Sequence, residues 1–204
     1  MLHLISERIK RMFFFCLSST IESGTDCSDN KLSAAQLSGL IKRISENDDD
    51  AFVQLYNISK SAVYGYILSI LNNPHDAEEI MQDTYLTINL KAGDFKPGGS
   101  AMAWILTIAK NHALMRLRKQ KAEVMTDQPP EIADPRQPFD QVNDRLVLSA
   151  LMKVLTDDER QIVMLYAVAG LKHHMIAKLC GMTLTAELSK YHRALKKLKK
   201  QIGE

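Results

Sequence analysis

The chain has 204 residues, of which 46% are hydrophobic and 25% charged, and its formal net charge is +2. This is the composition of an ordinary globular protein with one large or two small domains. No apolar run approaches the ~20 residues of a membrane span, which argues against a membrane-embedded chain. A net charge of this size does not by itself indicate nucleic-acid binding. The distribution of charge along the chain is therefore the better guide to whether it binds nucleic acid.

The cysteines and histidines do not form a metal-binding pattern. Cys16, Cys27 and Cys180 are odd in number and show no CxxC spacing, which favours reduced thiols in a cytoplasmic protein over a disulfide or zinc framework. His173 and His174 are adjacent, so on a helix they point about 100° apart and share no metal-binding face. We therefore expect neither a metal nor a cofactor.

Residues 1–31 are predicted to form a flexible leader. Three basic residues precede an apolar stretch at residues 12–17, which is the order found in a secretory signal. The apolar stretch is shorter than the ~7–15 residues of such a signal, and no small-residue cleavage site follows it. A secretory signal, or translation that truly starts at Met12, are the alternatives.

Residues 32–121 are predicted to form a first helical domain. Ser33 and Gln36 match a capping box, and leucine and isoleucine follow at helical spacing. Residues 47–50 break this helix. A second, longer helix follows and ends at the Asn-Asn-Pro of residues 72–74.

The same domain continues with two further helices. Asp76 is predicted to open the third. The sequence GDFKPGGS at residues 93–100 has the composition of a loop. Ser100 is predicted to cap a fourth helix that runs to Lys121.

A linker and a second helical domain are predicted next. Residues 122–140 hold four of the six prolines, and five acidic residues against one base, which indicates an extended acidic linker. In residues 141–204, Thr156 and Glu159 match a capping box, and Gly170 is a plausible helix stop. No segment shows a convincing strand pattern. The predicted fold is therefore all-α, with two small helical domains joined by a proline-rich acidic linker.

The second domain is predicted to contain a helix-turn-helix. Ile176, Ala177 and Leu179 mark a short helix, Gly181 allows a tight turn, and Thr185 is predicted to cap the next helix. In this motif the second helix enters the major groove of DNA.

The last helix is amphipathic. At 100° per residue its apolar side chains occupy an arc of roughly 80°, and so do its bases on the opposite side. A solvated basic face is the alternative explanation for such a helix, but the preceding turn favours DNA binding. The bases concerned are Lys190, Arg193, Lys197 and Lys200, with Lys196 beside them.

The predicted fourth helix carries a second basic face. A wheel places polar and basic residues in one arc of about 100°, and Trp104 borders it. Positive charge beside an aromatic ring suits a nucleic-acid strand whose bases are unstacking. The alternative is that Trp104 belongs to the core. The arc comprises Thr107, Lys110, Asn111, Arg118 and Lys121.

An acidic tract lies on the predicted third helix. Asp76, Glu78, Glu79 and Asp83 fall within eight residues that contain no base. Such a face repels DNA and suits a basic protein partner. An ordinary solvated helix surface is the alternative.

These motifs together resemble the bacterial RNA polymerase sigma factors, namely the extracytoplasmic-function (ECF) group of the sigma-70 family. The resemblance rests on DAEEIMQDTYLTI, WILTIAKNHALMRLRK, the proline-rich linker, TDDERQIVMLYAVAG and the hairpin, and covers residues 33–203. It implies core RNA polymerase (the β′ clamp and β flap) and promoter DNA as partners. Members commonly have an anti-sigma factor as a further partner. No cofactor and no membrane insertion are implied.

The resemblance also implies site residues. The helix that docks on the polymerase β′ clamp would use Ala77, Glu78, Glu79, Gln82 and Asp83. The part that opens and contacts the −10 promoter element would use Phe95, Lys96, Ser100, Trp104, Lys110, Asn111, Arg118 and Lys121. The part that contacts the −35 element would use Thr185, Ala186, Ser189, Lys190, Arg193, Lys196, Lys197 and Lys200.

Two departures from the family pattern lie in the hairpin. Met175 stands where members usually carry a glutamate, and Thr-Ala-Glu-Leu at residues 185–188 stands where they usually read Gly-Thr-Val-Lys. Glu187 is expected to repel DNA phosphates if it faces them. In the first turn of a helix it would also offset the helix dipole by roughly 0.3–1 kcal/mol.

The sequence therefore predicts a factor that directs core polymerase to specific promoters and assists their melting. The alternative is a helix-turn-helix regulator that binds duplex DNA without polymerase. An enzyme is not expected, because the sequence has no P-loop, dinucleotide glycine pattern, HExxH or GxSxG.

Overall fold

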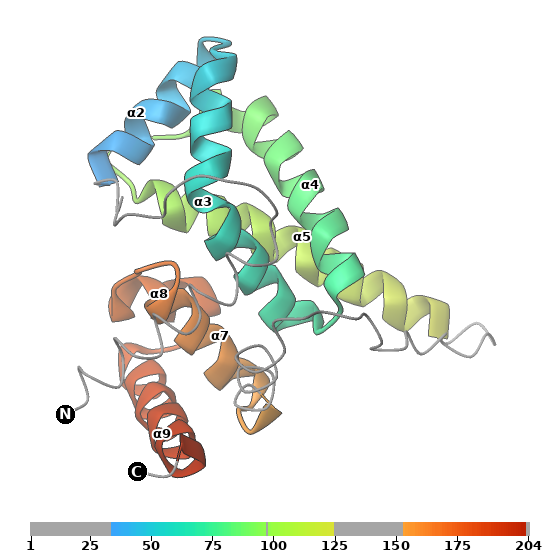
Figure 1. The fold of residues 1–204 in the computed structure, drawn as a ribbon, viewed down its shortest axis with the longest axis vertical. Coiled ribbons are helices and arrows are strands. Elements are labelled where there is room, and N and C mark those ends of the chain that lie inside the picture. Colours follow the sequence, from blue (N-terminus) through green and yellow to red (C-terminus); the bar gives the residue numbers. More distant parts are fainter. Residues whose placement is uncertain (1–33, 97, 125–152, 203–204) are drawn as a thin grey trace.

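The computed structural model describes residues 34–96, 98–124 and 153–202, and every regular element in these ranges is a helix (Figure 1). The all-α prediction is confirmed. The predicted leader, the cap at Ser33 and nearly all of the predicted linker lie outside the described residues. None of the described helices combines the length and the apolar character that crossing a bilayer requires.

The first helical unit contains four α-helices and one 3-10 turn. They are α2 (Ala34–Ser45), α3 (Asp49–Leu71), α4 (Pro74–Lys91), η1 (Ala92–Asp94) and α5 (Ala101–Val124). The breaks fall where the sequence predicts them. Asp48 caps α3 by accepting a 3.0 Å hydrogen bond from the Ala51 N–H, and Asn72 ends α3 in the left-handed conformation, with a φ of 55°.

The start of α4 differs from the prediction. Asn73, and not Asp76, caps the helix, because its side-chain oxygen accepts from the N–H groups of His75 (3.0 Å) and Asp76 (3.4 Å). Pro74 occupies the first helical position, where its missing N–H costs nothing. Asp76 lies within the first turn of the helix and is buried.

Helix α3 is the centre of this unit. Helices α2, α4 and α5 all pack against it (Figure 1), and its apolar side chains meet theirs in a continuous core. Removing each large aliphatic side chain of such a core from water contributes about 1.5–3 kcal/mol. The largest completely buried residues of this unit are Ile41, Leu55, Tyr66, Ile67, Ile88, Ile105 and Leu106.

The second unit consists of α7 (Asp157–Ala167), α8 (His173–Cys180) and α9 (Leu184–Ile202). The predicted capping box at the start of α7 is confirmed, since Thr156 and Glu159 bond each other's backbone N–H groups. Gly181 ends α8 with a φ of 71°, a conformation that glycine adopts without strain.

The start of α9 corrects a further prediction. The helix begins at Leu184, and the Thr183 hydroxyl accepts a 3.3 Å hydrogen bond from the Ala186 N–H. Thr183 is therefore the capping residue, and Thr185 lies exposed within the first turn. The turn between α8 and α9 is two residues shorter than the sequence predicts.

Two ion pairs tie α9 to the beginning of α7. Lys190 binds Asp158, and Lys197 binds Glu159 at 2.6 Å. Burial alone would raise the pKa of Glu159, but the hydrogen bonds from Lys197 and from the Thr156 backbone outweigh it and lower that pKa below its usual range. The charge of Glu159 therefore stabilises the packing of α7 against α9.

The two units also touch each other. Helix α7 packs against α3, and α8 contacts α5. Arg160 donates a 2.5 Å hydrogen bond to the side-chain oxygen of Asn72, and the Lys110 amine donates a 2.5 Å hydrogen bond to the Leu179 carbonyl. Lys110, which the sequence assigns to DNA, is thus engaged by α8.

Glu159→Gln is expected to lower the free energy of unfolding by about 1 kcal/mol at pH 7, because glutamine keeps the capping box but loses the charge that Lys197 binds. A depressed carboxyl pKa contributes stability above the unfolded-state pKa, and this contribution is lost as pH falls through the folded-state value. The difference between variant and wild type should therefore shrink below about pH 4.3.

Urea unfolding between neutral pH and pH ~3 measures this difference. Glu78→Gln, at an exposed position on α4, is the control and should leave stability unchanged. A difference for Glu159→Gln that stays constant across the pH range would contradict the electrostatic origin of the effect.

Candidate nucleic-acid and partner interfaces

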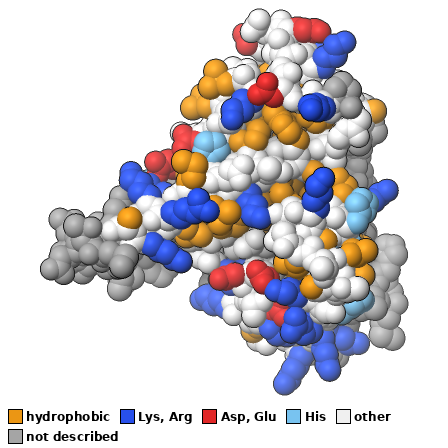
Figure 2. All heavy atoms as spheres, turned by 180° about the vertical axis from the view of Figure 1, so that it is seen from behind, with side chains coloured by type: hydrophobic (Ala, Val, Ile, Leu, Met, Phe, Trp, Pro, Cys, Tyr) orange, Lys and Arg blue, Asp and Glu red, His pale blue; other side chains and the backbone are white. Residues whose placement is uncertain are grey.

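One side of α9 presents a row of exposed polar and basic side chains. We call this row the recognition stripe. Its members fall within an arc of about 80° at 100° per residue. In Figure 2, Lys and Arg side chains gather over the end of the molecule where α9 lies. The stripe consists of Thr185, Ser189, Arg193, Lys196 and Lys200.

Three other residues assigned to the −35 element lie at the edge of this stripe, toward α7. Ala186 is half-buried. Lys190 and Lys197 are bound to Asp158 and Glu159. These two lysines are partly neutralised by acids of α7, so the exposed positive charge of α9 is concentrated in the recognition stripe.

Glu187 is completely buried, which overturns the expectation that it faces DNA phosphates. Its two carboxylate oxygens lie 2.9 and 3.1 Å from Nδ1 of His173. On the helical wheel Glu187 is only about 20° from Leu198, a core residue. The sequence therefore held the signal for its burial, but not for its partner.

The basic face predicted on α5 is largely exposed. We call it the basic strip. It comprises Thr107, Asn111, Arg118 and Lys121, all exposed. Lys110 lies at its edge, half-buried, with its amine on the Leu179 carbonyl. Figure 2 shows a second group of Lys and Arg side chains toward the C-terminal end of α5.

Trp104 is neither a core residue nor a free surface residue. It is partly buried against the core and packs edge-to-face on Phe95, with ring centroids 5.5 Å apart. The Ser100 hydroxyl accepts from the Ala103 N–H at 3.3 Å and so caps α5, as predicted. An aromatic pair therefore lies at the start of α5. The exposed Lys96 directly follows Phe95 and precedes the turn that leads to the helix of Trp104.

The exposed surface of α4 is acidic and apolar, and we call it the acidic–apolar face. Ala77, assigned to polymerase binding, is completely buried, so its side chain cannot contact a partner in this structure. Leu86 and Leu90 are 64% and 84% exposed, and sequence reasoning missed them as surface residues. Their i, i+4 spacing from Gln82 was the available signal. The face comprises Glu78, Glu79, Gln82, Asp83, Leu86 and Leu90, within an arc of about 140°.

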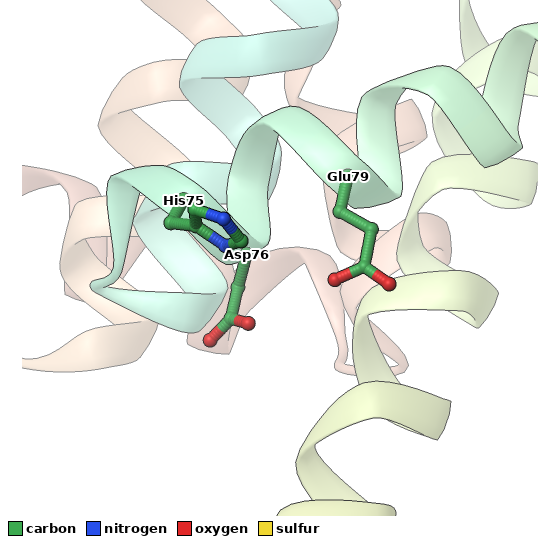
Figure 3. A group of neighbouring side chains, drawn as sticks. All are labelled: His75, Asp76 and Glu79. Atoms are coloured by element: carbon green, nitrogen blue, oxygen red, sulfur yellow. The ribbon is translucent and has the colours of Figure 1, made fainter. Parts of the chain in front are cut away.

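Three side chains at the start of α4 lie close enough to suggest a metal site (Figure 3). One ligand atom each of His75, Asp76 and Glu79 lies within 4.8 Å of the others. A divalent ion there would have to compete with a guanidinium group, because Arg116 lies between the two carboxylates, 2.5 Å from Asp76 and 3.4 Å from Glu79. The arrangement fits an ion-pair network and does not fit a metal.

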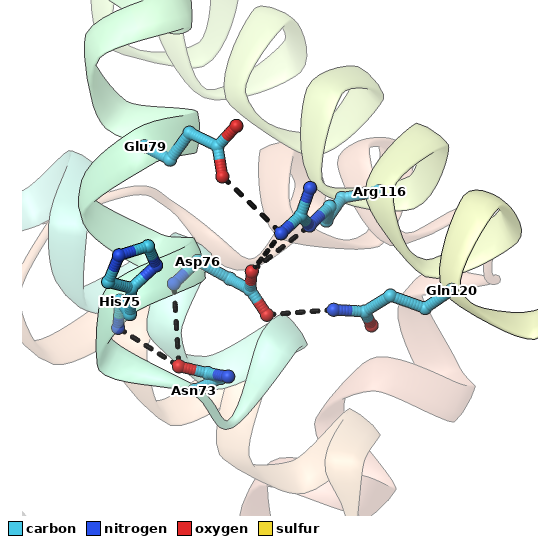
Figure 4. Close-up of polar contacts among 6 residues, drawn as sticks. All are labelled: Asn73, His75, Asp76, Glu79, Arg116 and Gln120. Carbon is cyan, nitrogen blue, oxygen red and sulfur yellow. Dashed lines mark hydrogen bonds and ion pairs between the residues drawn. The ribbon is translucent and has the colours of Figure 1, made fainter. Parts of the chain in front are cut away.

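This network joins α4 to α5 (Figure 4). The Arg116 Nε and Nη2 groups both donate to Oδ1 of Asp76, and the Gln120 amide donates to Oδ2 at 2.7 Å. Every oxygen of the buried carboxylate therefore has a donor from α5. The network fixes α5, with its basic strip, relative to α4, with its acidic–apolar face.

Two protein-family models match the chain in sequence order. Sigma-70 region 2 matches residues 55–123, and Sigma-70 region 4 matches residues 145–198. The first match contains the acidic–apolar face and the basic strip. The second contains all of the recognition stripe except Lys200.

Curated relatives and solved structures agree with these matches. An ECF RNA polymerase sigma factor SigK of Mycobacterium sp. (strain KMS) is 31% identical over 172 residues, covering 80% of this chain and 89% of the relative. The SigK of Mycolicibacterium vanbaalenii is 28% identical over 180 residues, covering 84% of this chain and 92% of the relative.

Two solved structures share the fold. The sigma factor RpoE of Bartonella quintana, in complex with the anti-sigma factor NepR, superimposes with a TM-score of 0.61 at 23% identity, covering 74% of this chain and 96% of that one. CnrH, in complex with the cytosolic domain of CnrY, superimposes with a TM-score of 0.56 at 20% identity, covering 82% of this chain and 97% of that one. With both sigma-70 regions in order and relatives matched over most of their length, the protein belongs to the extracytoplasmic-function group of RNA polymerase sigma factors.

Proposed function

We propose that the two helical units divide promoter recognition between them. Residues 32–121 hold core polymerase and the −10 element, and residues 141–204 hold the −35 element. The observation that carries this proposal is the separation of three surfaces of different chemistry on α4, α5 and α9. One is acidic and apolar, and two are basic.

The acidic–apolar face of α4 is the surface that suits a basic protein partner. Its carboxylates repel DNA, and its two exposed leucines add apolar area to a contact that charge alone would leave weak. We assign it to the β′ clamp of core polymerase, with Leu86 and Leu90 as additions to the residues that the sequence indicates. The β flap is assigned to the second unit.

The basic strip of α5 suits a promoter segment that is being opened. We assign Arg118 and Lys121 to phosphates, and Asn111 to a base edge. The rings of Phe95 and Trp104 offer a surface on which an unstacked base can lie, and stacking of this kind is worth ~1–3 kcal/mol per base. Promoter opening would be driven by this binding energy, without a chemical step in this chain.

The recognition stripe of α9 suits the major groove. Ser189 and Arg193 are assigned to base edges, and Lys196 and Lys200 to phosphates. Lys190 and Lys197 can contribute only if they leave their carboxylate partners on α7. The second unit is therefore expected to bind the −35 element with fewer phosphate contacts than its count of lysines indicates.

The two DNA surfaces have to separate for both elements to be bound. Positions −10 and −35 are about 25 base pairs apart, or roughly 85 Å along B-DNA at ~3.4 Å per pair. A compact chain of this length has a radius of gyration of only ~17 Å. Binding both elements therefore requires the contact between the two units to open, and the Lys110 amine to leave the Leu179 carbonyl.

One feature of the contact between the units favours opening. Tyr66 is completely buried, close to Cys180 of α8, and its hydroxyl has no hydrogen-bond partner among the described residues. A buried hydroxyl without a partner costs about 1–3 kcal/mol. Separation of the units would return this hydroxyl to water and recover part of that energy.

The proposed site of action is the cytoplasm, where core polymerase and promoter DNA are found. The two solved relatives are bound to an anti-sigma factor and to the cytosolic domain of CnrY. We propose that a protein of the anti-sigma type binds this chain and holds it inactive. A regulator that acts without polymerase is less favoured, because it would leave the acidic–apolar face without a role.

Glu78→Lys with Asp83→Lys is expected to weaken binding to core polymerase by more than about tenfold, since like charges would meet a basic partner. Trp104→Ala with Arg118→Ala should leave core binding intact and reduce promoter opening. Co-migration with core enzyme on a sizing column and permanganate footprinting of promoter DNA measure the two effects.

The matched control is Glu46→Lys with Asp50→Lys, which makes the same charge change at exposed acids outside the α4 face. It should behave as wild type in both assays. If the α4 pair and the control pair weaken core binding equally, the docking role of α4 is wrong. Failure of the folded wild-type protein to bind core enzyme or to direct transcripts would reject the function.

Linking the two units covalently is expected to reduce promoter binding by at least about tenfold. Asn72→Cys with Arg160→Cys places two thiols across the contact, in a chain whose three native cysteines are replaced by serine. A bis-maleimide bridges them, and a monofunctional maleimide serves as the control. Promoter complexes that form equally well with bridged and singly modified protein would show that opening is not required.

A further inference from the structure

The buried bond between His173 and Glu187 joins the two helices of the hairpin at a functionally sensitive place. Glu187 lies in the first turn of α9, two residues before Ser189 of the recognition stripe. His173 is the first residue of α8. The Nδ1 atom of His173 lies 2.9 and 3.1 Å from the two oxygens of Glu187.

The His173 ring also contacts the remaining helix of the unit. It stacks on Tyr166 of α7, with centroids 4.7 Å apart and planes inclined by 16°. Its edge meets Tyr191 of α9 at 4.8 Å and 63°, and Tyr191 follows Glu187 by one helical turn. One imidazole ring therefore contacts α7 and α9 while it belongs to α8.

A polar bond constrains geometry in a way that apolar packing does not. Apolar burial is non-directional, so it tolerates a small rotation of a helix, whereas a hydrogen bond weakens steeply with distance and angle. Rotating α9 by about 10° moves atoms at its surface, ~5–6 Å from the axis, by about 1 Å. That displacement exceeds the usual spread of hydrogen-bond lengths to a base edge.

We propose that His173 and Glu187 are positioning residues for −35 recognition. Their bond fixes the rotation and the angle of α9 against α8, and so decides which side chains of the recognition stripe reach the bases, although neither residue touches DNA. This inference rests on the assignment of α9 to the −35 element.

Stability alone is a weak explanation for the pair. A buried carboxylate and its hydrogen-bonding partner can often be replaced together by apolar residues of similar volume without loss of stability. A buried carboxylate therefore has to be explained by something that apolar residues would not supply. A defined direction for the recognition helix is such a property.

The test compares His173→Phe with Glu187→Leu, made together, against the wild type, both as full-length protein bound to core polymerase. This double variant removes the polar bond and leaves no unpaired partner. Two DNA probes are used in turn. The first is a library of genomic DNA fragments from the source bacterium. The second is a pool made from the most strongly transcribed fragment, with its −35 positions randomised.

The wild-type holoenzyme is expected to enrich a sharp −35 sequence from the randomised pool. The double variant should retain its unfolding temperature and its binding to core enzyme, but its preference at one or more −35 positions should fall by about threefold or more, from the ~10-fold that a well-read base pair ordinarily gives. Glu187→Gln, which keeps a hydrogen bond to His173, should retain most of the wild-type preference.

Leu198→Ala is the control for stability, because Leu198 is buried near the far end of α9. It should lower the unfolding temperature and leave the enriched sequence unchanged. If the double variant is itself less stable, this control shows whether lost stability alone can blunt the preference. A double variant that enriches the wild-type sequence with equal sharpness would overturn the positioning role. A wild-type holoenzyme that enriches no −35 sequence would reject the assignment of α9 itself.

Discussion

Three buried carboxylates orient the helices that carry the functional surfaces. Asp76 joins α4 to α5 through Arg116, Glu159 joins α7 to α9 through Lys197, and Glu187 joins α9 to α8 through His173. A buried carboxylate is tolerated only when it is paired and hydrogen-bonded, so each one demands a base at a defined point on a neighbouring helix. The helical core supplies stability, and these pairs restrict how the helices can slide or rotate.

The same pairs divide the charges of the protein into structural and functional groups. Arg116, Lys190 and Lys197 are bound to acids of neighbouring helices. The exposed lysines and the arginine of α9 that remain, Arg193, Lys196 and Lys200, belong to the recognition stripe. Each phosphate contact changes the logarithmic salt dependence of DNA binding by about 0.9, so this division bears directly on how strongly the second unit can bind. A modest net charge is therefore compatible with the two DNA surfaces proposed on α5 and α9.

The contact between the two units connects structure to the proposed activity. Helix α7 packs on α3, and α8 engages Lys110 of the basic strip. Apolar packing and the hydrogen bonds of Arg160 and Lys110 hold this arrangement, while the Tyr66 hydroxyl, which has no partner among the described residues, opposes it. Under the proposed function the two units have to separate along a promoter, and polymerase and DNA would supply the energy that opens this contact.

The sequence by itself determined the helical fold, the breaks at Asn72 and Gly181, and the capping box at Thr156, because these depend on residues a few positions apart. It also determined the family, through motifs in a fixed order. Only the tertiary structure decided which of several nearby polar residues caps a helix and which is recruited into the interior. Asp76 is drawn away from the cap by Arg116, forty positions along the chain, and the buried carboxylate of Glu187 finds its partner in His173 on the preceding helix. Periodicity predicts the face on which a side chain lies, but its partner depends on how separate helices pack, and no local pattern records that packing.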